Sequence, residues 1–128
     1  MKELPVILVI DDDHVIQGIV EEALSDGGFQ PAIAASAEEA LTLLRGNQGK
    51  YRALVTDINL PGKLDGWEVA RQVREIDPAF PMIYMTGDSA DQWAANGVPN
   101  SILLQKPFAP AQLVTAVSQL LNTGTPTT

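Results

Sequence analysis

Five short apolar segments recur along the chain, and longer stretches with a different periodicity separate them. Uninterrupted apolar runs rich in β-branched residues are typical of strands that are buried on both faces of a sheet. The second run is less apolar than the others and predicts a weaker strand. The five expected strands are Val6–Ile10, Gln30–Ala35, Ala53–Thr56, Met82–Met85 and Ser101–Leu104.

The stretches between these runs have apolar residues three and four positions apart, which predicts amphipathic helices. Ser36 and Asp65 each precede a glutamate by three residues, a pattern typical of a helix start, and Asp13 is suited to capping the first helix. The inward faces of the first and third helices are expected to consist of Val15, Ile16, Ile19, Val20, Ala23 and Leu24, and of Val69, Ala70, Val73 and Ile76. The five expected helices lie between Asp13 and Gly27, from Ser36 to about Arg45, from Asp65 to Pro78, at Asp88–Asn96, and from about Pro110 to Leu121.

Strand and helix alternate five times, which predicts an α/β fold with a doubly wound parallel sheet and helices on both faces. A chain of 128 residues is long enough for one domain with its own core. We expect this domain at residues 1–122. The Thr-rich residues 123–128 are expected to form a disordered tail or a truncated linker.

The composition narrows the classes of function. The net charge of −8 disfavours direct binding to nucleic acid or to an anionic membrane, because phosphates are bound by Lys and Arg. The absence of cysteine excludes disulfides and thiolate chemistry. No apolar run approaches the roughly 18 residues of a membrane span, and the N-terminal run is too short for a signal peptide. We therefore expect a cytoplasmic protein.

Four of the five apolar runs stop at residues that suit phosphoryl or metal chemistry. Asp11 and Asp12 follow the first run, and Asp57 follows the third. Thr86 follows the fourth run, and Lys106 follows the fifth. The carboxyl ends of parallel strands share one edge of a sheet, where open α/β sheets place their sites. The pattern therefore predicts carboxylates, a hydroxyl and an ammonium group at a common edge.

Carboxylate oxygens that converge without histidine or cysteine suit a hard divalent ion, most often Mg²⁺. Each group alone also has a simpler interpretation. The first acids can form a turn in which Asp13 caps a helix, and Asp57 can begin a turn. Asp88 can cap the fourth helix, and Lys106 can be a surface residue. The coincidence of all these groups at separate strand ends favours the functional interpretation.

In these residues the chain resembles the receiver domain of bacterial two-component response regulators. The matching segments are ILVIDDDHVI, ALVTDINLPG, LDGWEVARQVRE, PMIYMTG and LLQKPF, in the order and spacing of the family. The resemblance covers essentially residues 5–122 and, as a set of motifs, is highly specific. It implies a five-stranded (βα)5 sheet of the flavodoxin-like or CheY-like type, with strand order 2-1-3-4-5.

The resemblance also implies a phosphoacceptor and a metal site. Asp57 matches the aspartate that accepts a phosphoryl group from a phosphohistidine on a partner. Asp12 matches the direct ligand of Mg²⁺ (or Mn²⁺), and Asp11 matches its partner, which often acts through water. Asp57 and the backbone carbonyl of Asn59 match the groups that complete this metal site.

Further residues match the switch of the family. Thr86 matches the hydroxyl that hydrogen-bonds to the phosphoryl group, and Lys106 matches the lysine that pairs with it. The peptide bond from Lys106 to Pro107 is implied to be cis. Asn59 and Asp88 follow the acceptor and the switch threonine by two residues, at positions that tune the lifetime of the phosphorylated state. Asp88 would add negative charge there and help to orient water.

The chain departs from the family pattern at three places. Leu103, three positions before Lys106, stands where the family usually has an aromatic switch residue. The loop Leu60–Gly66 has one extra residue, with Leu64 in the role of the usual methionine. The segment Gly87–Asn100 lacks the usual Gly-Ala before the last strand. The pocket chemistry is complete, but the route by which a signal leaves it is not specified.

These features predict a phosphorylatable receiver, a switch module and not an enzyme. The expected donor is a sensor histidine kinase or a histidine phosphotransfer protein, which would contact the surface at Val15–Leu24. The expected output is a downstream protein target or a detached output domain, and a dimer through the last helices is compatible with the family.

Two other functions remain as alternatives. The first is a receiver-like interaction scaffold that works without phosphorylation, and the departure at Leu103 motivates it. The second is a Mg²⁺-dependent phosphatase of the haloacid-dehalogenase type. That class is disfavoured, because Asn59 stands where a second acid is needed and 128 residues leave no room for a lid domain.

Overall fold

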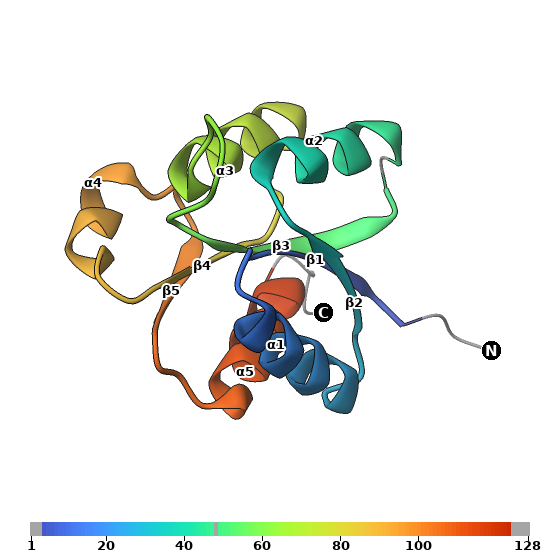
Figure 1. Cartoon of the computed structure of the whole chain (residues 1–128). Helices are drawn as coiled ribbons and strands as arrows, with labels where there is room; N and C mark the ends of the chain where they lie inside the picture. Colours follow the sequence, from blue (N-terminus) through green and yellow to red (C-terminus); the bar gives the residue numbers. More distant parts are fainter. Residues whose placement is uncertain (1–3, 48, 124–128) are drawn as a thin grey trace.

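The computed structural model describes residues 4–47 and 49–123, which form a five-stranded parallel sheet with helices on both faces (Figure 1). The strand order is β2-β1-β3-β4-β5, which confirms the doubly wound architecture and its implied order. The strands are β1 (Val6–Ile10), β2 (Gln30–Ala34), β3 (Tyr51–Asp57), β4 (Met82–Thr86) and β5 (Ser101–Gln105). The helices are α1 (His14–Asp26), α2 (Ala37–Gly46), α3 (Gly66–Ile76), α4 (Trp93–Asn96) and α5 (Pro110–Thr123).

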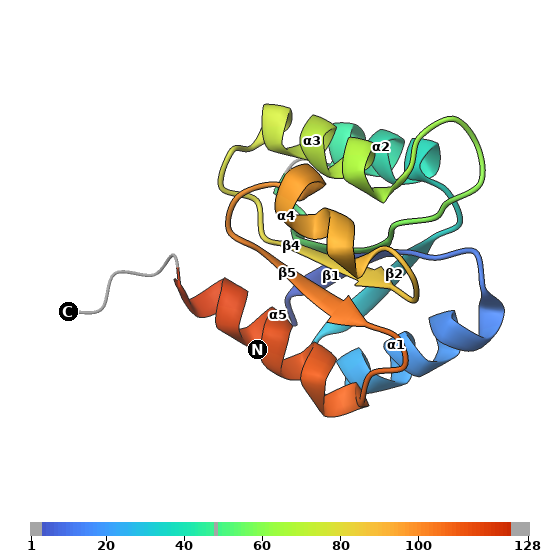
Figure 2. The same cartoon turned by 90° about the vertical axis from the view of Figure 1, so that its left-hand side faces the viewer.

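The sheet separates two apolar cores. Helices α1 and α5 lie on one face, and α2, α3 and α4 lie on the other (Figures 1 and 2). Alternate residues of each strand enter opposite cores, so that Leu8 and Ile10 pack with α2 and α3 while Ile7 and Val9 pack with α1 and α5. Because both faces are covered, the central strands need apolar side chains at every position, which explains the uninterrupted runs in the sequence.

Several strands extend further than predicted toward the functional edge. Asp57 is the last residue of β3 and pairs with Met85. Thr86 and Gln105 pair as the last residues of β4 and β5. At its other end, β3 begins at Tyr51, which is buried, two residues before the predicted start. Asp57 and Thr86 therefore have strand backbone, and their side-chain directions are set by the sheet.

The predicted caps of the first three helices are confirmed. The Asp13 carboxylate accepts the N–H groups of Val15 and Ile16 at 2.8 and 3.3 Å. Ser36 and Asp65 each accept the N–H group three residues ahead, at 3.1 and 2.9 Å. These side chains satisfy N–H groups that have no partner within the helix. The two local signals thus fix where α2 and α3 begin.

The predicted inward face of α1 is partly wrong. Val20, Ala23 and Leu24 are buried, but Val15 is 70% exposed and Ile19 is 42% exposed. These two residues lie one turn apart on the flank of the helix, outside the arc that the sheet and α5 cover. The apolar arc of α1 is therefore wider than its buried contact, and two large apolar side chains are left at the surface.

The fourth helix is shorter than predicted. A 3₁₀ turn at Ala90–Gln92 leads into the single turn of α4, and neither segment contains a buried residue. Ser89 occupies the position before the turn without a side-chain cap, so the interpretation of Asp88 as a cap is wrong. In α3, the prediction that Ile76 faces inward is wrong. Ile76 is the last residue of the helix, and its side chain is 38% exposed.

The last helix is longer than predicted. Helix α5 continues two residues beyond its predicted end, and residues 124–128 of the expected tail lie outside the described residues. None of the helices in the described ranges has the length and apolar character to cross a bilayer.

Gly66 allows α3 to start in close contact with the end of β3. Its N–H group donates to the carbonyl of Ile58 at 2.8 Å, and a β carbon at this position would collide with the backbone of Asp57 and Ile58. The glycine therefore brings the start of α3 against the backbone that carries the Asp57 side chain.

We predict that Gly66→Ala destabilises the fold by about 1–3 kcal/mol, since the added methyl group meets backbone atoms that cannot turn away. Urea unfolding followed by circular dichroism measures the change. The matched control is Gly18→Ala in the exposed part of α1, where a β carbon meets nothing within 4 Å. That variant should gain about 0.5–1 kcal/mol, because alanine favours a helix over glycine. Equal stabilities of Gly66→Ala and the parent would contradict this packing.

Candidate functional site

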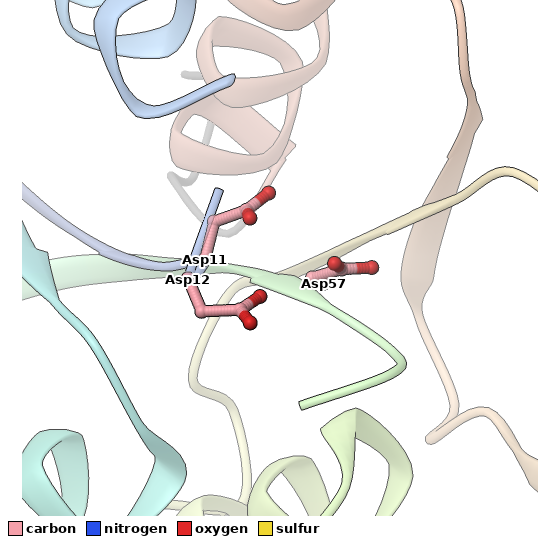
Figure 3. A group of neighbouring side chains, drawn as sticks. All are labelled: Asp11, Asp12 and Asp57. Atoms are coloured by element: carbon pink, nitrogen blue, oxygen red, sulfur yellow. The ribbon is translucent and has the colours of Figure 1, made fainter. Parts of the chain in front are cut away.

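Three carboxylates meet at the carboxyl edge of the sheet. Asp11 and Asp12 follow β1, and Asp57 ends the neighbouring strand β3. In Figure 3 the three side chains lie near one another, and one oxygen from each lies within 4.8 Å of the others. Asp11 is fully buried, whereas Asp12 is exposed. The predicted convergence of acids from two separate segments is therefore present.

Lys106 connects two of these acids. Its Nζ lies 3.4 Å from Oδ2 of Asp11 and 3.4 Å from Oδ2 of Asp57. The lysine follows β5, two strands away from β3, so its long side chain passes the end of β4 to reach both acids. The implied cis bond between Lys106 and Pro107 is confirmed. Both distances exceed the 2.7–2.9 Å of a strong ionic hydrogen bond, so the ammonium group is shared between the acids.

The negative charge is only partly balanced. Burial raises the pKa of Asp57 above its ordinary value of 3.8, and the charge of Asp11 raises it further, while Lys106 acts in the opposite direction. The ionised Asp57 is therefore less favourable in the folded chain than in water. A set of carboxylate oxygens with excess negative charge fits a hard divalent cation such as Mg²⁺.

Two groups that the sequence interpretation missed hold Asp11 in place. The N–H group of Asp13 donates to Oδ1 of Asp11 at 2.8 Å, and the Gln17 side-chain amide donates to the Asp11 carbonyl. The sequence could have indicated this contact, because Gln17 lies one helical turn after the capping residue Asp13 and its side chain can reach back to the start of the helix. These contacts fix both the backbone and the carboxylate of the buried acid.

The hydroxyl of Thr86 organises the loop after β4. Its Oγ1 accepts the N–H groups of Asp88 and Ser89 at 3.2 and 2.8 Å. Because the oxygen acts as an acceptor in both bonds, its own proton can be donated to another group. Lys106 donates its backbone N–H to the carbonyl of Thr86 at 2.7 Å, which joins the ends of β4 and β5.

The two predicted lifetime-tuning residues contact each other. The side-chain amide of Asn59 donates to Oδ1 of Asp88 at 3.2 Å, and Ser89 donates its hydroxyl to the same oxygen at 3.0 Å. The loops after β3 and β4 are thereby joined across the edge that carries the acids. The resemblance implied that both positions lie beside the acceptor, but nothing in the sequence indicated this bond.

Leu103 lies away from the acids. Its side chain is partly buried against the core below α2 and α3, and its partner across the sheet is Tyr84. A separate hollow of about 870 Å³ lies at the opposite edge of the sheet, lined among others by Arg52, Arg74 and Gln119, and it contains none of the predicted site residues.

Comparison with known proteins identifies the family. The model of the response regulator receiver domain matches residues 7–118, and the chain belongs to this family. The curated response regulator MprA of Mycolicibacterium vanbaalenii is 34% identical over 122 residues, which are 94% of this chain and 52% of that protein. The chain thus spans about half the length of the curated relatives it matches.

Solved structures have the same architecture. A response regulator receiver protein from Sinorhizobium medicae is 45% identical, with a TM-score of 0.90 and coverage of 94% of this chain and 97% of that chain. The receiver domain of the sensor histidine kinase PA1611 from Pseudomonas aeruginosa is 24% identical and shares the fold, with a TM-score of 0.83 and coverage of 94% and 100%. That domain is described with a magnesium ion coordinated in its active-site cleft.

We predict that Asp57→Asn raises the thermal midpoint of the metal-free protein at pH 7. The raised pKa of Asp57 means that the ionised carboxylate destabilises the fold, and this cost is complete above the folded pKa and vanishes below 3.8. Differential scanning calorimetry in the presence of a chelator should show a difference between variant and parent that narrows as the pH falls toward 4.

The matched control is Asp91→Asn, which removes an exposed acid from the turn before α4. Its thermal midpoint should stay close to that of the parent. A lower midpoint for Asp57→Asn than for the parent at pH 7 would show that the ion pair with Lys106 outweighs the cost of burying Asp57.

Proposed function

We propose that this chain is a phosphoacceptor switch in which Asp57 receives a phosphoryl group from a phosphohistidine on a partner protein. The observation that carries the proposal is the arrangement of Asp57 between two further acids and Lys106. The carboxylates supply a nucleophile and metal ligands, and the ammonium group supplies a fixed positive charge 3.4 Å from the Asp57 oxygen. Membership of the receiver family supports the same assignment.

In the proposed reaction, a carboxylate oxygen of Asp57 attacks the phosphorus atom of the donor. The P–N bond breaks as the P–O bond forms, and the released imidazole keeps the electron pair and takes its proton from solvent. Phosphoryl transfer depends on positioning and charge neutralisation more than on covalent assistance. Lys106 neutralises charge on the phosphoryl oxygens, and the Thr86 hydroxyl donates to one of them. Water later attacks the phosphorus and restores the Asp57 carboxylate.

Asp11, Asp12, Asp57 and the backbone carbonyl of Asn59 would hold Mg²⁺, and the same oxygen ligands suit Mn²⁺. When bound, the ion supplies positive charge to the phosphoryl oxygens. The convergence of three carboxylates within 4.8 Å supports this assignment, as does the raised pKa of Asp57.

The donor is proposed to dock beside α1. Val15 and Ile19 are exposed on α1. Ile19 also lines a hollow of about 260 Å³, together with Ile16, Lys106, Pro107 and Phe108. Large exposed apolar side chains that adjoin one another mark interaction surfaces. Because Lys106 contacts Asp57 and also lines this hollow, a partner seated there would lie next to the acceptor.

The proposed output is a protein–protein contact with a downstream target or an output domain, and the chain turns over no external substrate. The cytoplasmic location, the absence of nucleic-acid binding and a dimer through the last helices stay predictions from the sequence. The scaffold that works without phosphorylation has less support, because all the predicted pocket residues lie at one edge of the sheet.

We predict that the chain gains one phosphoryl group when it is incubated with Mg²⁺ and acetyl phosphate, as read by intact mass. Asp57→Asn should remain unmodified, because an amide is not a nucleophile for this transfer. Asp91→Asn is the matched control and should gain the group. An unmodified parent chain that also binds no Mg²⁺ would favour the scaffold, and rapid turnover of a phosphate ester would favour a phosphatase.

We predict that Asp88→Ala slows loss of the phosphoryl group by about tenfold, less than the effect of removing a direct proton acceptor. Asp88 contributes a carboxylate at the joined loops, where it can orient the attacking water. Decay of the phosphorylated chain is followed by intact mass after the phosphodonor is removed. Asp91→Ala removes the same charge three residues further on and should decay as the parent does. Equal decay of all three proteins would exclude this role for Asp88.

A further inference from the structure

Tyr84 places a polar group inside the core on the same strand as Thr86. The two residues are separated by one position on β4, so both side chains point to the face covered by α2 and α3. Tyr84 is fully buried, and its ring lies against Trp67 with 4.8 Å between the ring centres. Its hydroxyl oxygen accepts the N–H group of Val98 at 3.1 Å. Tyr84 therefore links β4 to the loop between α4 and β5.

The bond to Val98 continues to the surface. Ser101 donates its hydroxyl to the carbonyl of Val98 at 2.7 Å, and the indole N–H of Trp93 donates to the hydroxyl oxygen of Ser101 at 3.0 Å. Gly97 packs beneath Trp93, and a β carbon there would collide with the indole ring. Trp93 is 37% exposed. A change at Val98 therefore reaches an aromatic side chain on the outside of α4.

The other end of this loop is anchored elsewhere. The Arg74 guanidinium donates to the carbonyls of Pro99 and Asn100 at 2.7 and 3.4 Å. Since Arg74 belongs to α3, the loop is attached to α3 at one end and to β4, through Tyr84, at the other. A displacement of β4 relative to α3 therefore acts on the loop at Val98.

Leu103 cannot provide an equivalent link. It is the partner of Tyr84 across the sheet, but an apolar side chain makes no directional bond. The ring of Tyr84 is rigid and packed, so a shift of the β4 backbone carries its hydroxyl with it. A hydrogen bond of 3.1 Å is near the long end of the ordinary range, where a small shift changes its strength.

We propose that Tyr84 is the positioning residue that couples the phosphorylation state of Asp57 to the loop between α4 and β5 and to Trp93. This inference rests on the proposed function, since the phosphoryl group is what engages Thr86. The Thr86 hydroxyl turns toward the phosphoryl oxygen, β4 adjusts, and the Tyr84 hydroxyl changes its bond to Val98. The role belongs to Tyr84 because its hydroxyl makes the bond from β4 to Val98, whereas the apolar side chain of Leu103 on the neighbouring strand can make none.

The test compares the parent chain with Tyr84→Phe and Ser101→Ala in the presence of Mg²⁺ and acetyl phosphate. Two-dimensional ¹H–¹⁵N NMR follows the Val98 amide and the Trp93 indole N–H, and intact mass follows the phosphoryl group. In the parent, phosphorylation should shift both resonances. Tyr84→Phe should gain the phosphoryl group as the parent does but lose both shifts. Ser101→Ala should lose the Trp93 shift and keep the Val98 shift.

The outcomes separate the two proposals. A parent chain that gains no phosphoryl group overturns both of them. A phosphorylated Tyr84→Phe protein with parental shifts overturns the role of Tyr84 alone and leaves the phosphoacceptor function intact. If Tyr84→Phe does not fold, Ser101→Ala decides, because a Trp93 shift that persists there shows that the signal does not pass along these bonds. Leu103→Val is the matched control on the neighbouring strand and should retain both shifts.

Discussion

The central constraint on this molecule is the confinement of three carboxylates at one edge of the sheet, with the ammonium group of Lys106 beside two of them. Asp11 is fully removed from water, and the nearby Asp57 is largely so. Like charges held together at low exposure repel one another strongly, and a cation bound among them relieves this repulsion. The surrounding fold holds the acids in this arrangement. The first residues of the α1 region bind the Asp11 carboxylate, and Gly66 lets α3 pack against the end of β3, which carries Asp57.

Much of this arrangement could be predicted because its causes are local or topological. Apolar runs specify the strands, and the caps at Asp13, Ser36 and Asp65 specify the helix starts. Once the strands are parallel, the acids after β1 and β3 must share an edge. The remaining features depend on non-local packing. Ile19 is exposed because the sheet and α5 cover only part of the apolar face of α1. The width of the covered part depends on tertiary packing, which the pattern of a single sequence does not show.

The pair formed by Asn59 and Asp88 was beyond sequence analysis for a related reason. It joins two loops that are 29 residues apart in the sequence, and only the folded sheet brings their side chains together.

The net charge of the chain affects which partners it attracts. A net charge of −8 weakens the attraction of acidic partners, so the apolar surface at Val15 would have to supply most of the contact with a negatively charged donor.

The shortness of α4 has a thermodynamic consequence. Neither its single turn nor the 3₁₀ turn before it buries any residue, so little apolar area holds this segment in place. Segments with few buried contacts open locally at a free energy far below that of global unfolding. The conformational equilibrium of α4 is therefore the one that a single new hydrogen bond, worth about 1 kcal/mol, can shift substantially. This weakly held segment is thus suited to respond to a chemical change at the carboxyl edge of the sheet.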